Sequence, residues 1–193
     1  MSEKEGARGI KLHFDFHFHS CLSPCGDEAM TPATIAGMCK LSGLDAAALT
    51  DHNTCGNCAA FADRRGLRAA GPAGRGAVHA GGGPYSVRIP GPGAGRRLSG
   101  GGVPQPGGGP QRPGYFRPSA LSGRRRPCAG RGPRLLAGAT AIGVYEVPAL
   151  VERYGGAAWP AHIDRSSFSL LSNLGLWDPG LGFSLAEVSR DCP

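Results

Sequence analysis

One segment of this 193-residue chain, residues 62–133, has a composition that opposes a packed fold. Of its 72 residues, 20 are glycine and 11 are proline, and no apolar periodicity runs through it. Such a segment buries too little apolar surface to offset the conformational entropy that is lost on ordering. The composition therefore predicts a largely irregular segment between two protein-like parts, residues 10–61 and 134–193.

Charge is concentrated in the same segment. Residues 62–133 hold 13 Arg, no Lys and a single acid, Asp63, so they carry a net charge of +12. Because the whole chain carries +7, the remainder has a net charge of −5. Gly, Pro, Arg and Ala are residues of GC-rich codons, and our hypothesis is that the segment is a displaced reading frame. Translating the coding DNA in the other two frames tests this, and it fails if neither frame gives an acidic, periodic sequence.

The first protein-like part has the pattern of a strand–helix–strand unit. Ile10–His19 alternates like a strand. Thr31 is a suitable N-cap with Pro32 at the first helical position, and Gly43 is placed to end the helix. Asp45–Thr50 is a second short apolar strand. The unit predicts a parallel sheet, in which functional residues gather at the carboxyl ends of the strands.

The second protein-like part predicts a similar mixture of elements. Val147–Tyr154 has a helical pattern that Gly155 would end. Ala157–Ile163 has the character of a buried strand, and Ser166–Leu174 is a polar-capped helix start. Leu185–Ser189 is predicted as another strand. The expected fold class of the two parts together is α/β.

Three histidines follow from this arrangement as candidate metal ligands. Side chains alternate along a strand, so His17 and His19 are expected on one face, with Phe16 and Phe18 on the other. His52 comes at the end of the second strand. Parallel imidazoles at one edge of a sheet suit a divalent metal ion or half of a two-metal cluster.

Four stretches of the sequence, in order, resemble the PHP (polymerase and histidinol phosphatase) domain family. They are Asp15–Asp27, then Met30–Pro32, then Gly43–Asp45 with Leu49–Asn53, and finally Trp159–Arg165 followed by Ser169–Gly175, within residues 12–61 and about 134–193. The resemblance implies a distorted seven-stranded (β/α) barrel with two or three metal ions at its carboxyl end. It also implies hydrolysis of phosphate esters of small molecules or nucleotides, by water that the clustered cations activate.

The resemblance also implies roles for individual residues. The implied metal ligands are His17, His19, His52 and His162. Asp51 corresponds to an acid that orients the site, and Arg165 is close enough to His162 in sequence to hold a substrate phosphate, although an ordinary surface arginine fits as well. Zinc, manganese and iron all accept a histidine-rich site.

The chain departs from the family at several ligand positions. The family has the glutamate of a Gly-x-Glu turn and a further histidine about 25 and 33 residues after the Asp-His pair. In this chain those places lie near Ala77 and Tyr85 and hold no metal-binding residue. His79 lies nearby in glycine-rich sequence and is not expected to be a ligand. The resemblance also leads us to expect a final Asp-x-His pair beyond Ser189, and the sequence to Pro193 does not contain one. The resemblance therefore implies an incomplete barrel, truncated at the C-terminus, and an impaired or inactive phosphoesterase.

Two other functions remain open from the sequence. The Arg/Gly-rich residues 62–133 would bind RNA or DNA phosphates in a salt-dependent way, although aromatic residues are sparse there. Alternatively, two pairs of cysteines would form a structural zinc site. These residues are Cys21, Cys25, Cys55 and Cys58.

The sequence also predicts the cellular location of the protein. No run of apolar residues approaches the length of a membrane span, and Met1–Gly9 is charged and lacks an apolar signal region. The odd number of cysteines, seven, favours reduced thiols. A cytoplasmic location without membrane partners is the expectation.

Overall fold

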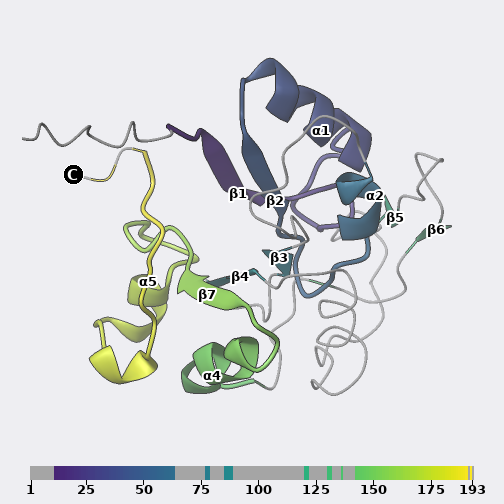
Figure 1. Ribbon diagram of the computed structural model, residues 1–193. Helices are drawn as coiled ribbons and strands as arrows, with labels where there is room; N and C mark the ends of the chain where they lie inside the picture. Colours follow the sequence, from purple (N-terminus) through teal and green to yellow (C-terminus); the bar gives the residue numbers. More distant parts are fainter. Residues whose placement is uncertain are drawn as a thin grey trace, which may run out of the picture.

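The computed structural model describes residues 11–63, 142–190 and 192, the short stretches 77–78, 85–88, 120–121 and 130–131, and residue 136. Its elements form a mixed α/β arrangement, with α1 and α2 beside β1 and β2, and α4, β7 and α5 grouped together (Figure 1). In chain order they are β1 (Phe14–Phe18), α1 (Pro32–Leu41), β2 (Ala46–Leu49), α2 (Cys58–Ala62), β3 (Ala77–Val78), β4 (Tyr85–Arg88), β5 (Ala120–Leu121), β6 (Gly130–Arg131), η1 (Val144–Glu146), α4 (Val147–Glu152), β7 (Ala157–Pro160), α5 (Leu170–Leu174) and η2 (Pro179–Leu181).

The first unit is the predicted strand–helix–strand. β1 and β2 pair in parallel, and α1 connects them in the sequence. The hydroxyl oxygen of Thr31 accepts a hydrogen bond from the Thr34 backbone N–H at 3.2 Å, and Pro32 occupies the first helical turn. Gly43, at φ +68°, takes the left-handed conformation that ends the helix. The local signals for this unit are confirmed.

β1 contains an irregularity that the alternating pattern does not predict. Asp15 lies opposite Ala47 and Phe18 lies opposite Leu49, so β1 holds one residue more than β2 over this stretch. Phe18 packs against the core, whereas Phe16 lines a pocket together with His17. The prediction that Phe16 shares the face of Phe18 is therefore wrong, because the extra residue breaks the alternation.

The C-terminal elements largely follow the predicted pattern. α4 begins at Val147 and its chain turns at Gly155, which has φ +67°. The predicted strand is present as β7, which ends at Pro160. α5 begins at Leu170 rather than Ser166, because Ser169 is the N-cap and accepts a hydrogen bond from the Ser172 N–H at 3.0 Å.

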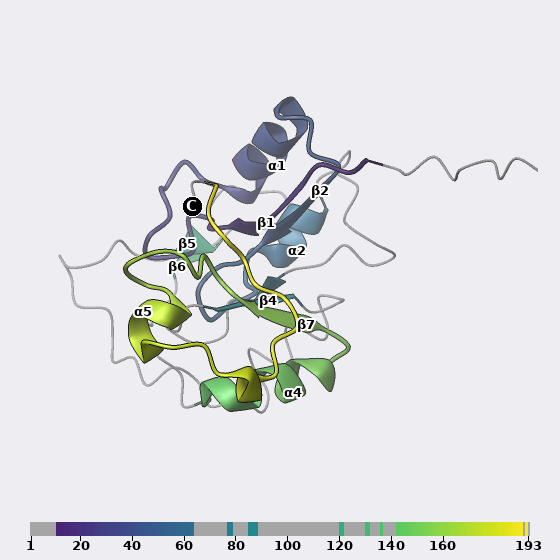
Figure 2. The same ribbon diagram turned by 90° about the vertical axis from the view of Figure 1, so that its left-hand side faces the viewer.

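The predicted strand at Leu185–Ser189 is wrong. The chain there is irregular but runs beside β7, where the Glu187 N–H donates to the Pro160 carbonyl and the Ile163 N–H donates to the Glu187 carbonyl, both at 2.9 Å. The next backbone N–H of this segment, that of Ser189, donates to the Asp164 carboxylate at 2.7 Å instead of to a backbone carbonyl, so no regular strand pairing forms. Figure 2 shows this C-terminal segment running past β7 towards β1.

The remaining described strands pair antiparallel. β4 pairs with β7 and also with β3, and β5 pairs with β6. β3, β4, β5 and β6 lie within 62–133, but most of that segment lies outside the described residues, so its largely irregular structure stays a prediction. Among the described strands, only β1 and β2 pair in parallel, so the barrel that the resemblance implies stays a prediction.

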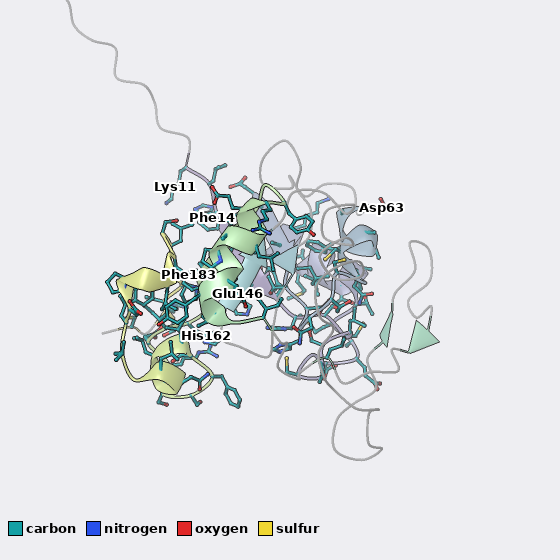
Figure 3. The ribbon with its side chains drawn as sticks, turned by 90° about the horizontal axis from the view of Figure 1, so that it is seen from below. Lys11, Phe14, Asp63, Glu146, His162 and Phe183 are labelled. Carbon is teal, nitrogen blue, oxygen red and sulfur yellow. The ribbon has the colours of Figure 1, made fainter. Side chains whose placement is uncertain are left out.

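Two apolar clusters hold the described elements together. One is built around Ile35, Leu49 and Phe61 and joins α1, β2 and α2. The other joins Val147 and Val151 of α4 to Phe183 and other partly buried side chains (Figure 3). A fully buried side chain of this size stabilises the fold by about 1.5–3 kcal/mol. The first cluster anchors β1 and β2, and the second lies against β7 through Ala158.

The described residues add two facts about membranes and thiols. Within them, no helix combines the length and the apolar character that a bilayer span requires. Their six cysteines, at positions 21, 25, 39, 55, 58 and 192, are all free thiols.

Candidate metal centre

Four histidine rings form a row where β1, β2 and β7 end. The rings of His162 and His17 are stacked, with centroids 5.5 Å apart and planes inclined by 15°. His17 and His19 follow at 5.1 Å, and His19 and His52 at 4.7 Å. The structure thus brings together all four histidines that the resemblance implies as metal ligands.

Three separate strands deliver these rings. His17 belongs to β1 and His19 follows directly after it, His52 lies shortly after β2, and His162 lies shortly after β7. His162 has φ +34°, a backbone conformation that residues other than glycine rarely adopt. Strain of this kind persists only where the surrounding structure holds it, and it gathers at functional sites.

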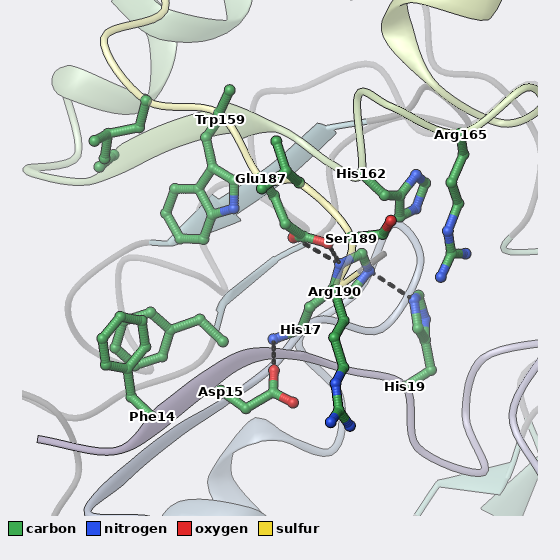
Figure 4. A pocket seen from close by; sticks show the side chains of 15 residues that line it. Phe14, Asp15, His17, His19, Trp159, His162, Arg165, Glu187, Ser189 and Arg190 are labelled. Atoms are coloured by element: carbon green, nitrogen blue, oxygen red, sulfur yellow. Dashed lines mark hydrogen bonds and ion pairs between the residues drawn. The ribbon is translucent and has the colours of Figure 1, made fainter. Parts of the chain in front are cut away.

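A carboxylate fixes the proton of His17. Both oxygens of Glu187 lie 2.9 Å from the Nδ1 atom of His17 (Figure 4). Partial burial raises the pKa of Glu187, but the His17 hydrogen bond and the nearby imidazoles lower it more, so that its pKa lies below the usual value. The ionised carboxylate only accepts hydrogen bonds, so Nδ1 of His17 carries the proton. In the neutral ring, the Nε2 atom then carries a lone pair.

A serine fixes the proton of His19. The single hydroxyl proton of Ser23 goes to Oδ1 of Asp51, at 2.7 Å. The Ser23 oxygen also accepts the backbone N–H of His52 at 3.0 Å, and it lies 3.2 Å from Nδ1 of His19. Because Ser23 has no second proton to give, Nδ1 of His19 must be the donor. The Nε2 atom of His19 therefore also carries a lone pair.

These two lone pairs face each other. The Nε2 atoms of His17 and His19 are 3.1 Å apart. Two lone pairs at this distance repel each other unless a cation, either a proton or a metal ion, lies between them. Two imidazole nitrogens on one tetrahedral zinc ion would be about 3.3 Å apart, given zinc–nitrogen bonds of about 2.0–2.1 Å. The spacing of the two Nε2 atoms therefore suits one shared cation, which is a proton in the metal-free chain and can be replaced by a metal ion.

Three of the four imidazoles in this row have a lowered pKa. Burial, reinforced by the neighbouring imidazoles, lowers the pKa of His19 to about 3. Burial and the charge of His17 lower the pKa of His52 to about 4. The pKa of His162 is also lowered, first by burial and then by His17 and Arg165. Neutral imidazole is the form that binds metal, so His19, His52 and His162 are ready to bind a metal ion near pH 7.

His162 adds a further observation in favour of a bound group. Its Nδ1 atom is buried and has no hydrogen-bond partner among the described residues. A buried nitrogen without a partner costs about 1–3 kcal/mol. A metal ion bound by the row fits this atom, because it would replace the missing partner.

Asp51 is placed differently from a metal ligand or a proton-transfer group. It is fully buried, and its carboxylate accepts the Ser20 N–H at 2.7 Å, the Ser20 hydroxyl at 2.6 Å and the Ser23 hydroxyl at 2.7 Å. Burial raises its pKa, and the hydrogen bonds from the two serines oppose that rise. Asp51 therefore acts through Ser23 on His19 and His52, as a positioning residue.

Arg165 lies at the edge of a pocket of about 800 Å³ that contains much of the histidine row (Figure 4). His17, His19 and His162 lie at the polar end of this pocket together with Arg165. The apolar wall is formed by Phe14, Phe16, Trp159, Leu185 and Val188. Asp15 and Glu187 also line this pocket, so it offers a ligand cationic groups, carboxylates and aromatic rings.

Several residues of the site are not predicted from the sequence. Glu187 is 170 positions from His17, and nothing in its local sequence links the two. The Trp159 indole N–H also donates to Glu187, although Trp159 is more simply read from the sequence as core packing. Arg190 lines the pocket as a second guanidinium group. Ser23 lies inside the first resembling stretch, so the resemblance was the only available signal for it.

The proposed four-cysteine zinc site is not assembled. Cys55 and Cys58 lie in the apolar core, where burial raises the pKa of Cys58 well above its usual value. Among the described residues, the group of side chains close enough to share a metal ion is instead His19, Cys25 and His52. One ligand atom from each of these three residues lies within 4.8 Å of the others.

We predict that Gly26→Ala disrupts the loop that carries Ser23 and Cys25. A Cβ atom at Gly26 would clash with the Ser20 carbonyl oxygen, which belongs to the backbone and cannot move cheaply. We expect a loss of about 1–3 kcal/mol in the free energy of unfolding, measured by chemical denaturation, because of this overpacking. Gly37→Ala is the matched control, since nothing lies within 4 Å of its Cβ in α1. It should stabilise the chain by about 0.8–1 kcal/mol, and equal effects of the two changes would contradict the prediction.

Geometry is the evidence for a metal centre here, and its four histidines, with Ser23 and Asp51, lie in short stretches near the ends of strands. Comparisons of the chain with family models, with curated proteins and with solved structures found no match.

Proposed function

We propose that this chain carries the metal site of a PHP-type phosphoesterase, with hydrolysis impaired. The observation that carries the proposal is the pair of Nε2 atoms, 3.1 Å apart, with both Nδ1 protons assigned to other partners. A divalent ion bound there supplies charge for phosphate oxygens and lowers the pKa of water. Zinc, manganese and iron are the candidate ions.

The residues around the row have separate roles in this proposal. Glu187 and Ser23 hold the two rings in the tautomers that expose Nε2, as carboxylates do for metal-binding histidines. Asp51 holds Ser23. Arg165 and Arg190 supply positive charge for a phosphate group, and the aromatic wall of the pocket excludes water from the organic group.

Impaired turnover follows from the ligand set. Neither the histidine row nor the group of His19, Cys25 and His52 supplies a carboxylate to the metal, since Glu187 is hydrogen-bonded to Nδ1 of His17. A two-metal hydrolytic site depends on rigidly held ions about 3.5–4 Å apart, and a bridging carboxylate is what fixes them. We therefore expect metal and phosphate to bind, with little or no chelator-sensitive hydrolysis of p-nitrophenyl phosphate even with added manganese. Robust chelator-sensitive turnover would show that the site is not impaired.

Binding of inorganic phosphate tests the proposal without depending on turnover. We expect the zinc-loaded chain to bind phosphate in a calorimetric titration and the chelator-treated chain to bind far less. Arg165→Gln should weaken binding about 10-fold, which corresponds to one charge-assisted hydrogen bond of about 1.4 kcal/mol. Arg153→Gln is the matched control, because Arg153 is exposed after α4 and does not line the pocket. Phosphate binding that is equal with and without metal would contradict the proposal.

A further inference from the structure

A thiol lies at the His52 end of the histidine row. Ligand atoms of His19, Cys25 and His52 all lie within 4.8 Å of one another. Cys25 is exposed, whereas Cys21, Cys39, Cys55 and Cys58 are buried. Of these five thiols, Cys25 is therefore the one that can meet an ion entering from solvent next to two imidazoles.

Backbone hydrogen bonds of the loop hold Cys25 in this place. The Ser23 N–H donates to the Ser20 carbonyl at 3.0 Å, and the Gly26 N–H donates to the Ser23 carbonyl at 2.9 Å. These two turns enclose Cys25 between Ser23 and Gly26, and Ser23 contacts both His19 and His52. The same hydrogen-bonded loop therefore sets the positions of the thiol and of the two rings.

The distances suit a metal ion with little rearrangement. On a tetrahedral zinc ion, an imidazole nitrogen and a thiolate sulfur would be about 3.6 Å apart, given bonds of about 2.0–2.1 Å and 2.3 Å. The group must therefore contract from within 4.8 Å by roughly an ångström. Rotation of the exposed Cys25 side chain supplies a movement of this size.

We propose that Cys25 is a thiolate ligand which, with His19 and His52, makes this end of the centre selective for zinc over manganese. The inference rests on the proposed function, because it requires the histidine row to bind divalent metal. Thiolate ligands favour zinc, whereas manganese favours oxygen ligands. On binding, the sulfur–metal bond forms and the thiol proton is released to solvent.

Cobalt titration of the full chain tests this directly, because a thiolate bound to Co²⁺ gives a charge-transfer absorption in the near ultraviolet. We expect this absorption in the unmodified chain, its loss in Cys25→Ser and its retention in Cys192→Ser. Cys192 is the matched control, since it is also an exposed thiol outside the group. Cys25→Ser should weaken zinc binding by about 10–100-fold and manganese binding by less than about 2-fold.

The outcomes separate this inference from the proposed function. A cobalt spectrum without the thiolate band, or a Cys25→Ser chain with unchanged zinc affinity, overturns the role of Cys25. If phosphate still binds in a metal-dependent way in that case, the proposed function stands without it. If the unmodified chain binds no cobalt or zinc at all, both fail together.

Discussion

His17→Ala is expected to abolish most metal binding by this chain. His17 lies in the middle of the row, within 5.5 Å of the His162 ring and 5.1 Å of the His19 ring, and its Nε2 atom faces that of His19 at 3.1 Å. Changes to residues that merely orient a ligand cost about 10–100-fold in metal affinity, so loss of the ligand itself should exceed about 100-fold. Equilibrium dialysis with zinc, followed by elemental analysis, measures this effect.

Two controls separate a specific site from adventitious binding by histidine. His13→Ala removes an imidazole that is exposed and lies outside the pocket. His79→Ala removes one that lies outside the described residues. Neither should change zinc binding by more than about 2-fold, far less than the effect of losing a ligand. Equal losses from His13→Ala and His17→Ala would show that the metal is adventitious.

Asp51→Asn is expected to unfold or loosen the site, although it changes the shape of the side chain very little. The Ser20 oxygen already accepts the Leu22 N–H at 3.2 Å and the Asn57 side-chain N–H at 2.8 Å. It has no lone pair left for the new amide, whose N–H would be buried without a partner. We expect a loss of about 3 kcal/mol in the free energy of unfolding, because hydrogen bonds to a buried charge are also weakened.

Denaturation at neutral pH and zinc dialysis should both report the Asp51→Asn change. Zinc affinity should fall together with stability, since Ser23, His19 and His52 lose their common support. Asp178→Asn is the matched control, because Asp178 is hydrogen-bonded to Tyr145 and Gly180 but is only partly buried, whereas Asp51 is fully buried. It should cost less than about 1 kcal/mol. Unchanged stability of the Asp51→Asn chain would contradict the positioning role of Asp51.

Local signals were sufficient for the short-range parts of the fold. Thr31, Pro32 and Gly43 predict the bounds of α1 through rules that act within one helical turn. The extra residue in β1 could not be predicted, because it arises from the pairing of β1 with β2 and leaves no mark in the alternation. The strand predicted at Leu185–Ser189 failed for a similar reason, since Asp164 takes the Ser189 N–H that a ladder would have used.

The same division applies to the site. His17, His19, His52 and His162 were recognised because they lie in short motifs, and the structure places them in one row. Glu187 and Trp159 were not, because their roles depend on a chain reversal that brings the C-terminal segment beside β7. The sequence predicts Cys25 as a ligand only together with other cysteines, because its histidine neighbours are brought to it by the fold of the loop.

Nitrogen-15 NMR of labelled histidines, recorded during a zinc titration, tests the metal centre most directly. In the metal-free chain we expect His17 and His19 to carry their protons on Nδ1, as the contacts to Glu187 and Ser23 require. One equivalent of zinc should shift the Nε2 signals of both residues and leave their Nδ1 atoms protonated. If zinc leaves the Nε2 signals of His17 and His19 unchanged, or shifts only His13, the histidine row is not a metal centre.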